Sequence, residues 1–328
     1  QQPQPGARSI ASVFLGGGTP SLFAPEALGR LLAALRQRVA FTPAAEITLE
    51  ANPGTIERGR FADYRAAGVN RVSLGAQSFA PQQLERLGRI HTVQDTRVAA
   101  EELHAAGLGN FNLDLMYALP GQDLAGALAD VHAAVELAPA HISHYQLTLE
   151  PGTVFGGRPP AGLPDDELSY AMQQRCQAEL AAAGFVQYEV SAYARAGAQC
   201  AHNLNYWNFG DYLGVGAGAH GKLTRASSGD IARTVREREP RRYLARGFAG
   251  APATVPVKRE ELPFEFMMNA LRLVDGFLPY RLRPMWESFT KFSPIALMAV
   301  MVFGGVLIAG PMRFAQGLLN HLLHWVVG

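Results

Sequence analysis

Short apolar runs alternate with amphipathic segments over the first half of the chain. Residues 10–15 form the first apolar run, and residues 25–38 then carry leucines at helical spacing. The same alternation continues to about residue 150. The predicted strands cover residues 10–15, 46–50, 71–74, 112–117 and 141–147, and the predicted helices cover residues 25–38, 56–67, 81–87, 93–106 and 124–137. Short strands that alternate with helices are typical of a parallel sheet, open or closed into a barrel.

The alternation stops after Glu150-Pro151-Gly152. The remaining pattern predicts a helix over residues 165–183, a strand over residues 187–193 and a last globular helix over residues 263–274. A polar segment at residues 202–207 and a glycine-rich segment at residues 214–220 lie between them. We therefore expect domain boundaries near Glu150 and Gly276. They give a strand–helix domain at residues 1–150, a smaller α+β domain at residues 151–276 and an atypical tail at residues 277–328.

The tail differs from the rest of the chain in its pattern. Residues 292–311 contain no charged side chain, and an apolar stretch of about 18 or more residues is a candidate transmembrane helix. A buried core helix is the alternative. Residues 314–328 contain many apolar side chains and could lie on a membrane surface or form part of a second helix.

Composition and charge narrow the class of protein. The chain has 328 residues, of which 48% are apolar and 17% are charged, and this composition excludes a disordered chain. Lys plus Arg number 29 and Asp plus Glu number 28, so the net charge of +1 argues against a nucleic-acid partner. The two cysteines, Cys176 and Cys200, cannot by themselves form a disulfide framework or a four-thiolate metal site.

Polar residues gather where the predicted parallel strands end, which is where ligands bind in such folds. They are Gly16 to Thr19, Glu50 with Asn52, Gln77 with Ser78, Asp114, and Gln146. The glycine run lets a ligand approach the backbone closely, and a plain tight turn is its alternative interpretation. It matches neither the dinucleotide fingerprint nor the phosphate-binding loop. The strand ends therefore predict one shared site of another kind.

The residue types at these ends indicate the chemistry of the ligand. Glu50 and Asp114 can accept hydrogen bonds from ribose hydroxyls or from an ammonium group. Gln77 and Arg89 can bind hydroxyls and a carboxylate, and arginine is suited to a bidentate contact. S-adenosylmethionine has a sugar, an ammonium group and a carboxylate, and it would use all of these side chains.

A succession of distinctive motifs runs through about residues 10–276. These are FLGGGTPSLF, LEANPGT, LGAQSF, LGRIHT, NLDLMYALPGQ, HISHYQLTLEPGT, QYEVSAYA, HNLNYW and LGVGAGAHG. In these motifs the chain resembles the radical S-adenosylmethionine proteins of the coproporphyrinogen-oxidase-like group. HNLNYW and LPFEFMMNALRL favour the heme chaperone branch over the oxygen-independent coproporphyrinogen III dehydrogenase branch.

The resemblance implies an incomplete parallel α/β barrel with a smaller C-terminal domain. It implies that the methionyl part of S-adenosylmethionine binds at the glycine motif and the rest of the ligand at acidic, amide and basic partners. The matching residues are Gly17, Gly18, Thr19, Glu50, Gln77, Arg89 and Asp114. It also implies heme as a ligand that is delivered to acceptor proteins. His202 of HNLNYW is the heme-ligand candidate, with a structural hydrogen bond as its alternative role; His144 and His220 are further candidates.

The chain departs from the family at both ends. The family's [4Fe-4S] cluster is held by a CxxxCxxC loop upstream of the glycine motif, and this chain does not contain that loop. We interpret Cys176 and Cys200 as small apolar filler or incidental thiols, and we predict no metal ligands and no reductive cleavage of S-adenosylmethionine by this chain. The abrupt start favours a fragment over a natural cluster-free relative, and the change near Gly276 suggests a frameshift, a misassembly or a gene fusion.

These observations predict a cytoplasmic heme chaperone that is incomplete as given. Its partners would be heme and heme-accepting proteins, with no nucleic acid and with membrane association through residues 292–328 left open. Two alternatives remain. One is oxidation of coproporphyrinogen III in porphyrin biosynthesis, and the other is a membrane-anchored heme-binding protein without catalytic activity.

Overall fold

The computed structural model describes residues 8–54, 59–246 and 252–274. It divides into two compact units, Gln1–Leu204 and Asn205–Gly328. The predicted boundaries near residues 150 and 276 stay predictions, and the predicted transmembrane helix at residues 292–311 lies outside the described residues. Within the described ranges, none of the helices combines the length and the apolar character that a membrane crossing needs.

The first unit is built on a sheet of seven strands in the order β1-β2-β3-β4-β5-β7-β6. The strands from β1 to β5 are parallel and follow one another in chain order, which confirms the predicted parallel sheet. Two short antiparallel strands, β7 and β6, extend it beyond β5. The bounds are β1 Ile10–Leu15, β2 Phe41–Ala51, β3 Arg71–Gln77, β4 Phe111–Tyr117, β5 His141–Gln146, β6 Val186–Glu189 and β7 Ala192–Ala194.

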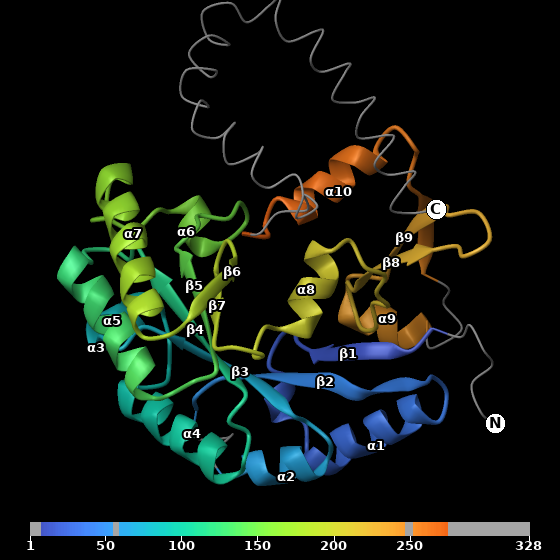
Figure 1. Ribbon diagram of the computed structural model, residues 1–328, viewed down its shortest axis with the longest axis horizontal. Coiled ribbons are helices and arrows are strands. Elements are labelled where there is room, and N and C mark those ends of the chain that lie inside the picture. Colours follow the sequence, from blue (N-terminus) through green and yellow to red (C-terminus); the bar gives the residue numbers. More distant parts are fainter. Residues whose placement is uncertain (1–7, 55–58, 247–251, 275–328) are drawn as a thin grey trace, which may run out of the picture. The chain divides into compact units, whose positions relative to one another are not determined.

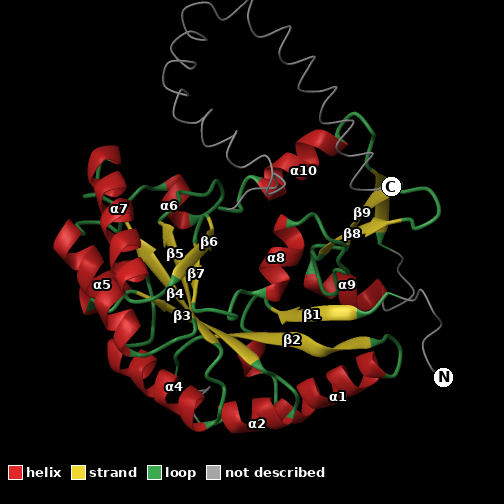
Figure 2. Ribbon diagram, in the orientation of Figure 1, coloured by secondary structure: helices red, strands yellow, loops and turns green. Residues whose placement is uncertain are grey.

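Helices connect the parallel strands and line the outer side of the curled sheet, so that this unit forms half of a barrel (Figure 1). Figure 2 shows the same separation, with helices outside and strands inside. The helices of this unit are η1 Pro20–Leu22, α1 Pro25–Arg36, α2 Phe61–Ala66, α3 Pro81–Arg86, α4 Val93–Ala105, α5 Leu124–Glu136, α6 Val154–Gly157 and α7 Asp166–Ala182. The next helix, α8, spans Ala201–Trp207.

The two faces of the sheet differ because side chains alternate along a strand. On β3, Val72 and Leu74 are fully buried in the main hydrophobic core. Arg71 and Ser73 belong to the opposite, inner face, where they are also buried. The alternation therefore gives the half-barrel an apolar outer face and a polar inner face.

The structure replaces one predicted strand with a hairpin and shows a helix in a segment for which no element was predicted. The strand predicted over residues 187–193 is instead the hairpin of β6 and β7, because the Glu189 carboxylate holds the turn by accepting hydrogen bonds from the backbone nitrogen and the Oγ of Ser191 at 3.1 and 2.9 Å. The polar segment at residues 202–207 is helical and makes up most of α8.

The second unit contains a three-stranded antiparallel sheet in the order β10-β9-β8. Its elements are β8 His220–Thr224, β9 Ile231–Val235, α9 Pro240–Arg246, β10 Ala253–Pro256 and α10 Leu262–Ala270. Lys222 on β8 is buried, and its Nζ donates hydrogen bonds to the Phe209 carbonyl oxygen at 2.8 Å and to Asp211 Oδ1 at 3.0 Å. These bonds compensate the cost of burying the ammonium group.

Candidate functional site

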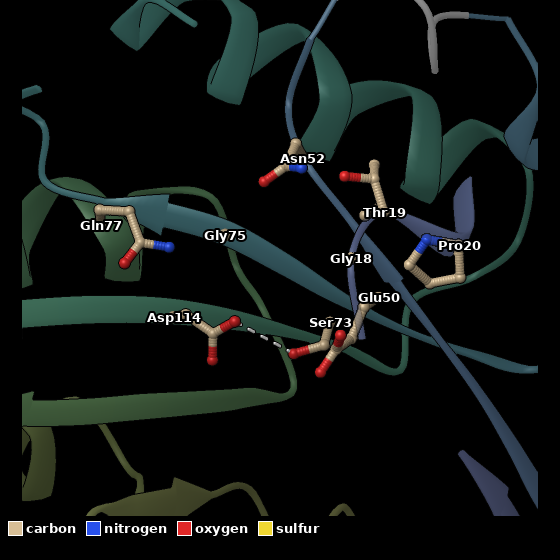
Figure 3. A pocket seen from close by; sticks show the side chains of 10 residues that line it. Gly18, Thr19, Pro20, Glu50, Asn52, Ser73, Gly75, Gln77 and Asp114 are labelled. Carbon is tan, nitrogen blue, oxygen red and sulfur yellow. Dashed lines mark hydrogen bonds between the residues drawn. The ribbon is translucent and has the colours of Figure 1, made fainter. Parts of the chain in front are cut away.

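The ends of the first parallel strands enclose a pocket of about 180 Å³ on the inner side of the sheet. Figure 3 shows its side chains, which come from the β1 loop, from β2 and the residues that follow it, and from β3 and β4. The lining residues are Gly18, Thr19, Pro20, Glu50, Ala51, Asn52, Ser73, Gly75, Gln77 and Asp114. The structure therefore brings five of the predicted binding residues together in one place.

The glycine loop after β1 takes a shape that requires glycine. Gly17 and Gly18 have φ angles of 84° and 67°, in the left-handed region that other residues rarely adopt. The backbone nitrogen of Gly17 donates a hydrogen bond to Glu50 Oε2 at 3.0 Å. A Cβ at Gly16 would lie 2.9 Å from the Glu50 carboxylate carbon. Glycine at these positions thus allows the loop to close onto Glu50.

Asp114 lies in the middle of β4 rather than at its end. Its two carboxylate oxygens accept hydrogen bonds from Asn112 Nδ2 at 2.8 Å and from Ser73 Oγ at 3.3 Å. Burial raises the pKa of Asp114 to about 6, against the lowering effect of those two hydrogen bonds, while the negative charge of Glu50 raises it further. Asp114 is therefore a carboxylate at neutral pH with a proton affinity well above the ordinary one.

Gln77 closes β3 and is only 4% exposed. Its Oε1 accepts a hydrogen bond from the Tyr145 hydroxyl at 3.4 Å. A Cβ at Gly75 would stand 2.9 Å from Gln77 Nε2, so the glycine leaves room for the amide over the pocket. Tyr145 was not predicted as a site residue; the alternation along β5 was its available signal, because Tyr145 shares a face with His141 and Ser143.

Two of the predicted residues, Arg89 and Ser78, do not line the pocket. Arg89 follows α3, is exposed and does not line the pocket, but its positive charge reaches the neighbouring Tyr145. There burial and the charge of Asp114 raise the pKa of the phenol, while Arg89 lowers it. Ser78, predicted with Gln77 at the strand end, is fully buried and donates a hydrogen bond to Asp130. Ser73, on the same face of β3 as Gln77, lines the pocket instead.

Below the pocket, hydrogen bonds continue along the inner face of the sheet. Asn112 Oδ1 contacts His141 Nδ1 at 2.7 Å, and His141 Nε2 contacts the Tyr188 hydroxyl at 2.8 Å. The Tyr188 oxygen accepts from the backbone nitrogen of Cys200 at 3.2 Å. Burial holds the pKa of His141 well below its ordinary value, so this ring is neutral. A polar chain thus runs from Asp114 to the start of α8.

The three histidines proposed as heme ligands lie in different surroundings. The His202 ring is half-buried and stacks on Phe14 with ring centroids 4.5 Å apart, and burial lowers its pKa to about 4. The His144 ring is 3% exposed and stacks on Tyr117. His220, at the start of β8, is exposed. His202 therefore combines a neutral ring with partial access, whereas His144 is enclosed.

Both cysteines are buried and protonated. Cys176 lies in α7 within the main core, and burial raises the pKa of its thiol to about 12. Burial raises the pKa of Cys200 to about 11, and its Sγ lies 3.5 Å from Glu46 Oε1. Iron–sulfur clusters are held by thiolates, so these two residues do not fit that role. Within the described part of the chain, no group of three or more His, Cys, Asp or Glu residues is placed to hold a metal ion.

The comparisons with known proteins agree on a family. Residues 6–132 match the Radical SAM superfamily. The heme chaperone HemW of Escherichia coli is 50% identical over 269 residues, which cover 82% of this chain and 70% of that protein. The heme chaperone HemW of Haemophilus influenzae is 49% identical over 290 residues, which cover 88% of this chain and 74% of that protein.

A solved structure shares the fold. Coproporphyrinogen III oxidase (HemN) from Escherichia coli, a radical SAM enzyme, superposes with a TM-score of 0.72 over 89% of this chain and 72% of that chain, at 22% sequence identity. This similarity shows the half-barrel fold, and the closer sequence relatives decide the branch. The chain therefore belongs to the heme chaperone HemW family of the radical SAM superfamily.

Proposed function

We propose that this protein is a heme chaperone that binds S-adenosylmethionine in the strand-end pocket and carries heme to acceptor proteins. The observation that carries the proposal is the 50% identity with a protein named heme chaperone HemW, over 82% of the chain. The pocket supplies the second support, because its polar groups suit the ligand that gives the superfamily its name.

The fit to S-adenosylmethionine rests on charge and on hydrogen-bonding capacity. The ligand has a sulfonium, an ammonium group and a carboxylate, which sum to a net charge of about +1 by the ordinary ionisation of these groups. Glu50 and Asp114 offer carboxylates to its cationic groups and hydroxyls, and the Gln77 amide both donates and accepts. A Cβ at Gly17 or Gly18 would meet nothing within 4 Å, so the loop beside Thr19 leaves space for the methionyl part. The exposed Arg89 is the basic residue that we propose for the ligand's carboxylate.

A [4Fe-4S] cluster, when bound in this superfamily, supplies the electron that cleaves S-adenosylmethionine. Cys176 and Cys200 do not fit as its ligands, because each is a buried thiol with a raised pKa. The proposal therefore assigns ligand binding to the residues of this chain and derives no radical step from them.

Calorimetric titration of the full chain with S-adenosylmethionine tests the nucleotide site. We expect saturable binding that Glu50→Gln weakens about tenfold, since a hydrogen bond to a charged group contributes roughly 1.5–3 kcal/mol. Glu85→Gln is the matched control, because Glu85 is an exposed carboxylate on α3 outside the pocket. Equal weakening by both variants would contradict the proposal that S-adenosylmethionine binds beside Glu50.

Two assays on the same preparation separate the heme chaperone from coproporphyrinogen III oxidation. Hemin titration followed in the Soret band should give stoichiometric binding, and a parallel titration with coproporphyrinogen III should give no saturable binding. The reverse result would favour the oxidase, whose solved relative shares the fold at 22% identity.

The cellular place of the protein and its acceptors are part of the same proposal. We place it in the cytoplasm, where it would meet heme and heme-accepting proteins. Contact with a membrane through residues 292–328 remains a prediction from their apolar sequence. Fractionation of cells that express the full chain and a variant ending at residue 276 tests it, because a membrane contact predicts that only the full chain sediments with membranes.

A further inference from the structure

The backbone at Gln77 is unusual for a residue with a side chain. Its φ angle is 67°, in the left-handed region. The Ser78 nitrogen donates to the Ala76 carbonyl oxygen at 2.9 Å, which closes a tight three-residue turn with Gln77 at its centre. Turns of this kind are rare because they are strained, and they persist only where the surroundings impose them. The register between β3 and β4 also shifts between Leu74 and Gln77.

One carboxylate binds the two residues that follow Gln77. Asp130 Oδ1 accepts from the Phe79 nitrogen at 2.6 Å and from Ser78 Oγ at 3.0 Å, and Oδ2 accepts from the same Ser78 Oγ at 2.8 Å. Gln122 Nε2 donates to Oδ2 at 3.1 Å. The carboxylate thus fixes both a backbone and a side-chain group immediately after Gln77.

The surroundings of Asp130 fix its side chain in position. It lies on α5 with 3% exposure, and its neighbours Ala127 and Val131 are buried in the main core. A carboxylate has two accepting oxygens and no hydrogen when ionised, so it can satisfy donors from three residues at once. An asparagine of the same size would turn an NH₂ group toward some of those donors. The site is therefore built for a carboxylate.

We infer that Asp130 is a positioning residue of the ligand pocket: by clamping Ser78 and Phe79 it imposes the left-handed turn that aims the Gln77 amide over the pocket. The inference deepens the proposed nucleotide site and rests on it for its function. Asp130 does not line the pocket, so it acts through Gln77.

A stability cycle tests the imposed turn without any ligand. Glycine adopts the left-handed region freely, so Gln77→Gly should raise the urea midpoint of the otherwise unchanged protein. In the Asp130→Asn background the turn can relax, and the same substitution should raise the midpoint less or not at all. Equal shifts in both backgrounds would overturn the inference. Ser78→Ala, which removes one partner of Asp130, serves as the second perturbation if Asp130→Asn does not fold.

A binding cycle with S-adenosylmethionine tests the effect on the pocket. Asp130→Asn should weaken binding several-fold when Gln77 is present and cause no further change in the Gln77→Gly background, since the two residues would act as a unit. Asp123→Asn is the matched control, because Asp123 caps the same helix at Gly126 and asparagine caps equally well. Equal weakening in both backgrounds would mean that Asp130 acts by another route. If the unchanged protein binds no S-adenosylmethionine, the proposed function fails, while the stability cycle still decides the role of Asp130.

Discussion

Glu50 and Gly17 form a contact that ties the second strand to the glycine loop, with Glu50 Oε2 3.0 Å from the Gly17 nitrogen. The contact exists because Gly16 has no Cβ, which would lie 2.9 Å from the same carboxylate. Such a separation is shorter than van der Waals contact, so a side chain at residue 16 must displace either the loop or Glu50.

Gly16→Ala should therefore weaken S-adenosylmethionine binding about tenfold through the displaced Glu50 carboxylate, the same order as losing one charged hydrogen bond. Gly29→Ala in α1 is the control, because its Cβ would meet Ala67 at an ordinary 3.6 Å. Calorimetry measures both affinities. An unchanged affinity of the Gly16→Ala variant would show that the contact does not shape the binding site.

The raised pKa of Asp114 predicts how the binding of S-adenosylmethionine depends on pH. Its pKa is raised to about 6, chiefly by burial, so the carboxylate becomes protonated as the pH falls from 7 to 5. The ionised fraction falls about tenfold for each pH unit below the pKa, and affinity for a cationic ligand should fall with it. Asp114→Asn should bind weakly at pH 7 and lose this dependence. Titrations at pH 7 and pH 5 check the prediction, and a Glu50→Gln variant that keeps the dependence would assign it to Asp114.

The stability of the fold depends on the charge of Asp114 in the opposite direction to ligand binding. Because the folded-state pKa of Asp114 is raised above the unfolded value of 3.8, its contribution to stability is fully present below that value and is lost as the pH rises through about 6. A more acidic solution thus favours this part of the fold while it weakens the ligand site. Buried Asp130, whose pKa burial also raises to about 6, contributes in the same direction.

The parallel strands and most of the pocket could be predicted from the sequence because the relevant signals are local. Apolar runs mark the strands, and the carboxyl ends of parallel strands meet at one edge, so Glu50 and Gln77 converge without further information. The position of Ser78 could not be predicted. Its partner Asp130 is 52 residues away, and the turn that directs Ser78 into the core depends on that pairing.

The hairpin of β6 and β7 was missed for a related reason. Residues 187–193 contain neither glycine nor proline, so the pattern predicts one continuous strand. The turn depends on the Glu189 carboxylate binding Ser191, a side-chain interaction that hydropathy does not reveal. Tyr145 lies within the motif HISHYQLTLEPGT, but the sequence does not show that its hydroxyl reaches Gln77, 68 residues away. Only its strand face was predictable, from alternation.

Arg71 and Glu46 form a buried pair on the inner face of the sheet, with Arg71 Nε 3.8 Å from Glu46 Oε2 and the arginine side chain 2% exposed. Arg71→Met should destabilise the protein by about 3 kcal/mol, because it leaves the buried Glu46 carboxylate without its arginine. The loss should lie at the lower end for a buried ion pair, since Glu46 still accepts hydrogen bonds from the backbone nitrogens of Ala201 and His202. Chemical denaturation measures the cost. Adding Glu46→Gln should recover part of it, and a larger loss in the double variant would contradict the pairing.

Of the three candidate histidines, His202 has the surroundings that best suit an iron ligand. Its ring is neutral at pH 7 because burial lowers its pKa to about 4, and a neutral imidazole has a lone pair for iron. Its backbone nitrogen donates to Glu46 Oε1 at 3.3 Å and its ring stacks on Phe14, so its position is fixed from two sides.

His202→Ala should therefore abolish the Soret signature of ligated heme in a hemin titration, while His132→Ala leaves it unchanged. His132 is the matched control because it is an exposed histidine on α5 whose Nε2 lies 3.1 Å from Glu179 Oε2. Circular dichroism of each variant separates loss of the ligand from loss of the fold. Retention of the signature in His202→Ala together with its loss in His220→Ala would transfer the ligand role to β8. Loss in His144→Ala with an intact fold would instead require the enclosed ring beside Tyr117 to become accessible when heme binds.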